Sequence, residues 1–118
     1  MEQTFTIQGR FCSLNEFYRL HHYAQGKTKA EHEARVIEAV KQAGIKPVER
    51  CTYSVLWVEQ NHRRDLDNVA FGKKFIQDGL VKAGIIPNDT ADYIAGFSDS
   101  FAYNAKEPRI IVTIHEIE

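Results

Sequence analysis

The sequence predicts an α+β fold, with a small mixed β-sheet packed with helices, in one domain over residues 1–118. Two observations support this prediction. Strand and helix signals follow each other in the order β-α-α-β-α-β-β, which is typical of a mixed sheet. No internal repeat, linker or low-complexity segment divides the chain, and its length of 118 residues suits a single hydrophobic core.

The first elements are a strand and a short helix. Residues 4–8 alternate between polar and apolar side chains, which predicts a strand that ends at Gly9. Ser13-Leu14-Asn15-Glu16 matches a capping box, in which the side chains of the first and last residues bind amides at a helix start. We expect this helix to run to about Tyr23.

A second helix is predicted from Thr28 up to Gly44. Its start matches another capping box, Thr28-Lys29-Ala30-Glu31, and a glycine is a suitable residue at its end. Helical spacing predicts an apolar face made of Ala30, Ala34, Ile37, Val40 and Ala43. The charged side chains are expected to point mostly outward, namely Glu31, Glu33, Glu38 and Lys41.

A strand and a long helix follow. Residues 52–58 are rich in β-branched and aromatic side chains, which predicts a strand. The third helix is expected to begin at about residue 65 or 66 and to end at residue 82, before Gly84. Gly72 and Gly79 share one side of it, where a second element could approach closely. We expect that side to form part of a dimer interface.

The C-terminal part of the chain predicts a turn and two strands. Pro87-Asn88-Asp89-Thr90 has the composition of a turn. Residues 93–100 form a strand pattern that is interrupted at Gly96, and residues 109–114 form a continuous apolar run typical of a buried strand. These elements complete the mixed sheet.

Composition sets limits on location. No apolar run approaches the ~20 residues that span a bilayer, and no basic-then-apolar signal opens the chain. Cys12 and Cys51 have no metal-type or redox-type spacing, which favours two reduced thiols. The five histidines also lack compact metal-ligand spacing. We therefore expect a cytoplasmic protein without membrane contact.

The charge of the chain permits a nucleic-acid partner without indicating one. The formal net charge is −1, whereas nucleic-acid binders are usually basic. Residues 61–74 nevertheless carry a local charge of +2, and so do residues 10–35. Local charge, rather than total charge, determines the field at a site.

Asp65 and Asp67 are the first candidate site residues. An aspartate is a preferred N-cap, which explains one of them well and the second poorly. Two carboxylates so close repel each other unless a cation lies between them, and a hard cation such as Mg²⁺ would suit. Asp89 is a third candidate ligand, although the far end of the third helix is about 25 Å away along the helix axis. It joins the pair only if its turn folds back, or from a partner chain.

Lys74 is the candidate catalytic cation. On a helical wheel it shares one sector with Asp67 and Asp78, whereas Lys73 points away from that sector. Lys74 could form an ion pair with Asp78 four residues later. It could also stabilise the phosphate oxygens in a transition state. Asp78 could orient this lysine or add a carboxylate to the site.

Several basic residues are candidates for DNA contact. Arg63 and Arg64 precede the two aspartates, where they could bind phosphate in bidentate fashion. A second group mixes cations with aromatic side chains, which suits branched or unstacked nucleic acid. The full set of expected DNA-binding residues is Arg63, Arg64, Lys73, Arg19, Lys27 and Lys29, with Tyr18 and Tyr23 beside the last three.

The sequence resembles the RusA family of Holliday junction resolvases, which are common in phages and prophages. Asp65-Leu66-Asp67-Asn68 is similar to the family's D-x-D-N signature, and Lys74 with Asp78-Gly79-Leu80 is similar to its lysine and D-x-L pattern. Residues 83–89 (Ala-Gly-Ile-Ile-Pro-Asn-Asp) resemble its A-G-(hydrophobic)-x-D-D turn. A weaker similarity covers Ser13, Asn15 and Tyr18, without the prolines that precede this motif in the family.

The resemblance implies a site and an assembly. Asp65, Asp67 and Asp89 would be the metal-site acids, Asp67 and Lys74 the catalytic residues, Mg²⁺ the cofactor, and a RusA-like homodimer the active form. Two features depart from the family pattern. Ala70-Phe71-Gly72 look inserted before the lysine, which leaves open whether Lys73 or Lys74 takes its role, and Asn88 replaces one acid of the D-D pair.

Together, these observations predict a magnesium-dependent endonuclease that resolves four-way DNA junctions during recombination and repair. Two alternatives stay open. The aspartates could be helix caps in a protein that binds branched DNA without cleaving it, or the enzyme could cut flaps and other branched DNA.

Overall fold

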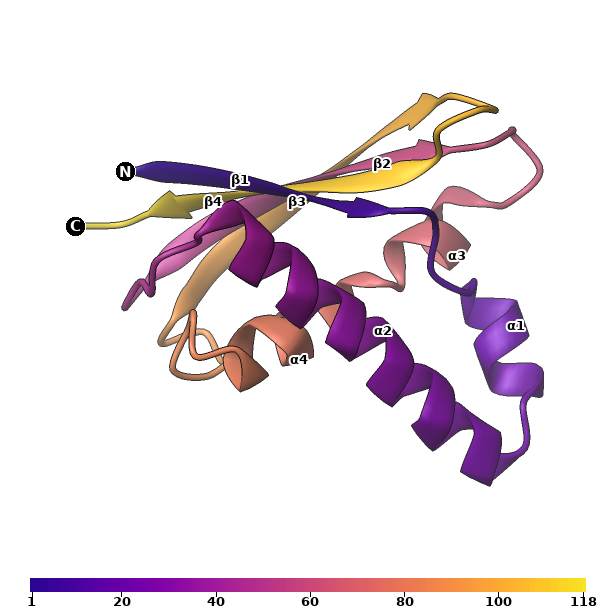
Figure 1. Ribbon diagram of the computed structural model, residues 1–118, viewed down its shortest axis with the longest axis horizontal. Coiled ribbons are helices and arrows are strands. Elements are labelled where there is room, and N and C mark those ends of the chain that lie inside the picture. The colour runs from indigo at the N-terminus through magenta and orange to yellow at the C-terminus, as the bar shows by residue number, and fades with distance from the viewer.

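The computed structural model describes all 118 residues and confirms the α+β fold with a mixed sheet (Figure 1). Its elements, in chain order, are β1 (Glu2–Gln8), α1 (Leu14–Arg19), α2 (His22–Ala43), β2 (Cys51–Glu59), α3 (Leu66–Ala70), α4 (Lys73–Lys82), β3 (Ile94–Tyr103) and β4 (Arg109–Glu116).

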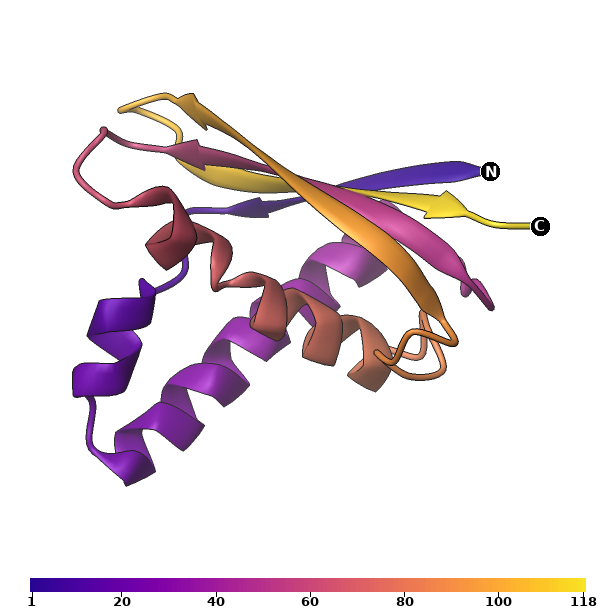
Figure 2. The ribbon, with the colours of Figure 1, turned by 180° about the vertical axis from the view of Figure 1, so that it is seen from behind.

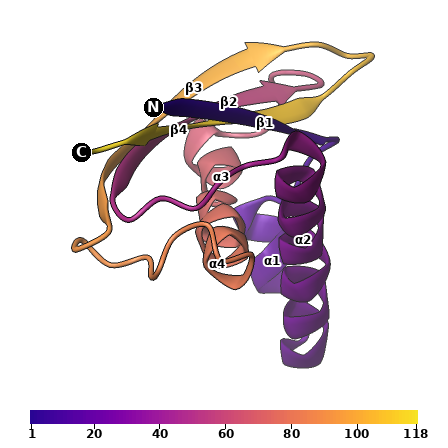
Figure 3. The same cartoon turned by 60° about the vertical axis from the view of Figure 1, so that its left-hand side comes forward.

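The four strands form one sheet in the order β1-β4-β2-β3. Strand β4 is antiparallel to both of its neighbours, whereas β2 and β3 are parallel and are joined through α3 and α4. All helices lie on one side of the sheet and leave its other face uncovered (Figures 1 and 3). No helix of the chain is long and apolar enough to cross a membrane.

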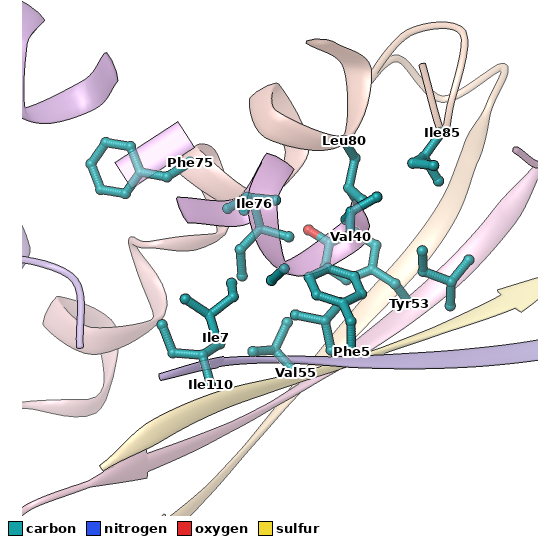
Figure 4. Close-up of a cluster of buried hydrophobic side chains, with 14 of the residues drawn as sticks. Phe5, Ile7, Val40, Tyr53, Val55, Phe75, Ile76, Leu80, Ile85 and Ile110 are labelled. Carbon is teal, nitrogen blue, oxygen red and sulfur yellow. The ribbon is translucent and has the colours of Figure 1, made fainter. Parts of the chain in front are cut away.

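The hydrophobic core fills the space between the sheet and the helices α2 and α4 (Figure 4). Strands β1, β2 and β4 contribute every second side chain to it, because alternate residues of a strand face the same side. Trp57 and Tyr53 are the largest side chains of the core, and each is 2% exposed. Burial of such rings contributes strongly to stability.

The predicted third helix is broken. It is two helices, α3 and α4, separated at Phe71 and Gly72. Gly72 lies so close to the rings of Phe11 and Trp57 that an added Cβ would be 3.0 Å from each. The prediction of one helix over residues 65–82 was therefore wrong. Helical periodicity in the sequence contains no information about the close contact between Gly72 and Trp57 of β2.

Gly79 also has an internal role. An added Cβ would lie 2.7 Å from the Cβ of Val36, so the glycine lets α4 approach α2 closely. Gly72 and Gly79 are both buried within the chain. The expectation that their side forms part of a dimer interface was wrong, because this chain's own helix and core aromatics already cover them.

The two N-terminal helices differ from their predicted bounds. The capping box at Ser13 is confirmed, since both of its hydrogen bonds are present. Helix α1 ends at Arg19, however, and α2 begins at His22, so that Thr28 lies inside a helix and caps nothing. Helix α2 turns a partly different face to the core than predicted. Val40 is buried as expected, but Glu33 is 1% exposed, whereas Ala30 and Ala34 face solvent.

Candidate functional site

An open depression of about 530 Å³ runs along α3 and α4 on the side of strand β3. Figure 2 shows this side of the molecule, with the edge strand β3 above the two helices. The depression is lined by Asp67, Ala70, Phe71, Lys73, Lys74, Gln77, Asp78, Asp89 and Phe97. It therefore contains two of the three predicted metal ligands and both candidate lysines.

The chain path brings Asp67 and Asp89 to this depression from opposite ends of the helices. Asp67 lies in the first turn of α3, directly after the loop that follows β2. Asp89 lies in the turn between α4 and β3, which is anchored by Ile85 and Ile86, 4% and 2% exposed. The turn folds back along α4, so Asp89 reaches the depression within one subunit. No partner chain is needed for this.

Asp65 occupies a different position. It is the N-cap residue of α3, but its side chain makes no capping hydrogen bond. It does not line the depression, and its side chain is exposed. Capping by the side chain therefore explains neither aspartate, since the Asp67 carboxylate accepts only from the amide of Asn68 at 3.0 Å.

Lys73 is held at the wall of the depression. Its ammonium group lies 2.5 Å from a carboxylate oxygen of Asp99 and 5.0 Å from the centre of the Phe97 ring. The other oxygen of Asp99 accepts from the Trp57 indole at 2.8 Å. Because the helix breaks at Gly72, Lys73 turns toward β3 instead of away from the site, which corrects the expectation from the helical wheel.

Asp99 and Phe97 were missed in the sequence. They lie in β3, the strand predicted over residues 93–100, which pairs in parallel with β2. An acidic residue between two aromatic ones in an edge strand was the available signal, but only the strand pairing places it beside Lys73 and Trp57.

Lys74 is less constrained than Lys73. Its side chain is 59% exposed, and its nearest acidic partner is Asp78, 3.9 Å away on the next turn of α4. Asp78 also pairs with Lys29 of α2 at 3.1 Å. The ammonium of Lys74 thus faces the open depression with one loose contact, so a phosphate group could pair with it without first breaking a close ion pair.

An ion cluster around the buried Glu33 joins α2 to α4 beside the depression. Glu33 pairs with Lys29 at 2.5 Å and also with Lys82. The hydrogen bond to Glu33 raises the pKa of Lys29, which holds this lysine in its charged form. Burial of a carboxylate is tolerated where cations pair with it. This explains why Glu33 faces inward, contrary to its predicted outward position.

The acidic side chains of the depression meet the needs of Mg²⁺ in part. No three His, Cys, Asp or Glu side chains lie close enough together to hold one metal ion. Mg²⁺ commonly keeps several waters and uses one or two carboxylates together with substrate phosphates. Asp67 and Asp89 are carboxylates of that kind on one open surface. Either carboxylate could therefore serve as one ligand of a cation held largely by a bound phosphate, and the residues do not form a complete site made by protein alone.

The basic residues expected to bind DNA differ in availability. Arg64 donates to the Phe11 carbonyl at 2.9 Å and pairs with Glu16 at 2.5 Å, so it ties the loop before α3 to the start of α1. Lys29 and Lys73 are also in internal ion pairs. The side chains that face solvent without an internal partner are those of Arg63, Arg19 and Lys27.

His32 has a structural role. It packs against the rings of Phe11 and Phe75, and its Nε2 atom accepts from the Cys12 amide at 3.1 Å. Burial, followed by the charge of Arg35, lowers the pKa of His32 to about 4. The imidazole is therefore neutral at pH 7 and serves as a hydrogen-bonded core residue.

No protein-family model matches the chain, and no curated protein matches it significantly.

Proposed function

We propose that this protein is a magnesium-dependent endodeoxyribonuclease of the RusA type that resolves four-way DNA junctions by paired phosphodiester hydrolysis. One observation carries the proposal: Asp67 and Asp89, which are distant in sequence, line the same open depression as Lys74. Carboxylates beside a free cation are suited to phosphoryl chemistry, since charge develops on the phosphate oxygens.

Each residue has a role in this proposal. Asp67 and Asp89 would hold Mg²⁺ together with the substrate phosphate, and Asp65 would join them when DNA is bound. The bound cation would supply Lewis-acid stabilisation and a more acidic water. Lys74 would neutralise charge on the non-bridging oxygens, and Asp78 would limit the positions that this lysine samples. Lys73 would shape the wall of the site through Asp99.

The resemblance to the RusA family adds support from two matched segments and from the position of one insertion. Asp65-Leu66-Asp67-Asn68 stands at the start of α3, and Lys74 and Asp78 lie one turn apart on α4. The inserted Ala70-Phe71-Gly72 coincides with the break between the two helices. The break accommodates the extra residues. Both lysines line the depression, but Lys73 is paired closely with Asp99 whereas Lys74 is only loosely paired, which favours Lys74 as the equivalent of the family's lysine.

The proposal includes a partner and an assembly. Branched DNA in the cytoplasm is the substrate, and a homodimer is the active form, because two opposed incisions in a symmetric junction suit a two-fold assembly. Arg63 is the exposed cation next to the proposed metal ligands, so we place it on a phosphate beside the cleaved bond.

The experiment is cleavage of synthetic DNA by the purified protein. A four-way junction, a fork and a linear duplex of equal length are incubated with protein in Mg²⁺ and in EDTA, and products are resolved on a denaturing gel. We expect symmetric nicks in the junction, only with Mg²⁺. If the protein cuts the fork preferentially, it is a flap or branch nuclease instead. Equal cutting of all three, or none, would contradict the proposal.

A junction-binding protein without cleavage is the second candidate. It is favoured by the lack of a group of three ligands close enough to hold a metal. A gel-shift experiment with the same three DNAs separates it from the enzyme, since this candidate retains the junction in Mg²⁺ and leaves it uncut.

A further inference from the structure

A second surface of the protein is formed by α1 and the N-terminal half of α2, away from the sheet. Helix α2 is 22 residues long, but its buried residues all lie in its C-terminal half: Glu33, Val36, Ala39 and Val40. The N-terminal half of α2 and the adjoining α1 extend away from the sheet (Figure 1). We call this surface, residues 17–30, the α1–α2 arm.

The arm is basic and lacks acidic residues. Residues 17–30 contain Arg19, Lys27 and Lys29 and neither Asp nor Glu, in a chain whose total charge is −1. Lys29 is paired at the edge of the depression, whereas Arg19 and Lys27 face solvent. Arg19 and Lys27 therefore present positive charge that no internal carboxylate balances.

The arm also exposes aromatic rings. Tyr23 is 82% exposed and Tyr18 is 67% exposed, the two largest values among the exposed tyrosines of the chain. Exposed rings beside unpaired cations are the combination that binds unstacked nucleobases and their phosphates.

Gly26 adds an independent observation. Tyr23, Gly26 and Lys27 lie on one face of α2 and, with His22, line a hollow of about 400 Å³. A glycine inside a helix lowers the helical propensity of the segment. Nothing in the chain lies within 4 Å of a Cβ added there, so no internal contact requires it. Without a side chain at this position, a flat base could lie against the helix beside the Tyr23 ring.

The arm is continuous with the candidate active site. The Tyr18 ring lies 6.1 Å from the ring of Phe71, which lines the depression with Asp67. At the other edge, Lys29 contacts Asp78 of the same depression at 3.1 Å. A strand whose phosphate occupies the depression would reach the arm with its next nucleotides.

We infer that the α1–α2 arm binds unpaired bases of branched DNA, with Tyr23 stacked on a base, Gly26 providing the space beside it and Lys27 on the adjoining phosphate. This inference rests on the proposed function for the choice of DNA as the ligand. It adds a binding site for unstacked nucleotides outside the depression.

The test measures binding without cleavage. A fluorescent single-stranded oligonucleotide and a four-way junction with unpaired bases at its centre are titrated with protein in Ca²⁺, and anisotropy gives each Kd. We expect Tyr23→Ala to weaken both by about 5- to 150-fold, since a stacked base contributes about 1–3 kcal/mol. Tyr23→Phe should bind like the natural protein, because the ring is kept.

Matched controls lie on the same helix. Lys27→Ala should weaken binding and reduce the dependence of log K on log salt by about 0.7 for each phosphate that the variant no longer binds. Lys41→Ala removes another exposed lysine, in the last turn of α2, and should change neither quantity. If Tyr23→Ala and Lys27→Ala bind as the natural protein does, the inference is wrong.

The outcomes separate this inference from the proposed function. If Tyr23→Ala binds DNA normally and the natural protein nicks junctions in Mg²⁺, the inference about the arm is wrong and the proposed nuclease function stands. If the natural protein binds single strands through Tyr23 but never nicks junctions, the inference about the arm is supported and the proposed nuclease function is wrong. Failure of the natural protein to bind any of these DNAs would overturn both.

Discussion

Lys73 and Lys74 are neighbours in the sequence with different surroundings. Lys73 is held by Asp99 and lies over Phe97, whereas Lys74 is 59% exposed and only loosely paired. An ammonium already neutralised by a close carboxylate gives little field to a bound phosphate. We therefore assign stability to Lys73 and phosphate contact to Lys74.

Substitution separates these two roles. Lys74→Ala should lower junction nicking by about 10²-fold or more, as removal of one transition-state donor does, and change the free energy of unfolding by less than about 0.5 kcal/mol. Lys73→Ala should lower that free energy by roughly 1–2 kcal/mol, because Asp99 would then have no cation beside it. Urea unfolding and a nicking time course check both. The reverse pattern would exchange the roles of the lysines.

His32 gives the protein a defined response to acid. Its pKa is about 4 when folded and 6.5 when unfolded, so the unfolded state binds the proton first as the pH falls. The contribution of neutral His32 to the free energy of unfolding is complete above pH 6.5 and is lost as the pH falls through 4. We expect the free energy of unfolding to be about 2 kcal/mol lower at pH 5 than at pH 7.

A control isolates this histidine. His32→Gln keeps a hydrogen-bond acceptor for the Cys12 amide and cannot titrate. Its stability should change much less between pH 7 and pH 5, measured by urea unfolding at both values. An unchanged pH dependence in this variant would assign the effect to another group.

At the scale of elements, two glycines set how α4 sits against its neighbours. Gly79 packs against Val36 of α2, and Gly72 against Phe11 and Trp57 at the helix break. These contacts fix the direction of α4 and hence the side of the molecule on which Lys74 and Asp78 are displayed.

Alanine substitution tests this packing. Gly79→Ala should lower the free energy of unfolding by about 1–3 kcal/mol, because the added methyl overpacks Val36. Gly26→Ala in α2 is the matched control, since open space surrounds it, and it should raise stability by up to about 1 kcal/mol. Thermal unfolding of both variants gives the comparison. Equal stabilisation by both would show that α4 does not press on α2.

Local sequence signals predicted some elements well and others poorly. The Ser13 capping box and the alternating strands depend on neighbouring residues, so their positions were close to those observed. The break at Gly72 and the inward direction of Glu33 depend on partners in other elements, namely Trp57 and Lys82. Hydrophobic periodicity carries no information about such partners.

The whole molecule presents the acid-lined depression and the α1–α2 arm on one side of its sheet. The acid-lined depression could be predicted in part, because Asp67 and Asp89 are recognisable by type and motif. Their placement in one depression depends on the turn after α4 folding back, which buried Ile85 and Ile86 determine. Asp99 could not be predicted to contact Lys73, because the contact follows from the parallel pairing of β2 with β3.

We propose that DNA is hydrolysed in the depression that Asp67 lines. The most direct measurement compares Asp67→Asn with Asp92→Asn, an exposed aspartate near Asp89 that does not line the depression. Both variants are incubated with a four-way junction in Mg²⁺, and binding and nicking are measured in parallel. We expect both to bind and only Asp92→Asn to nick. If Asp67→Asn nicks the junction at the rate of the natural protein, this depression is not the site of hydrolysis.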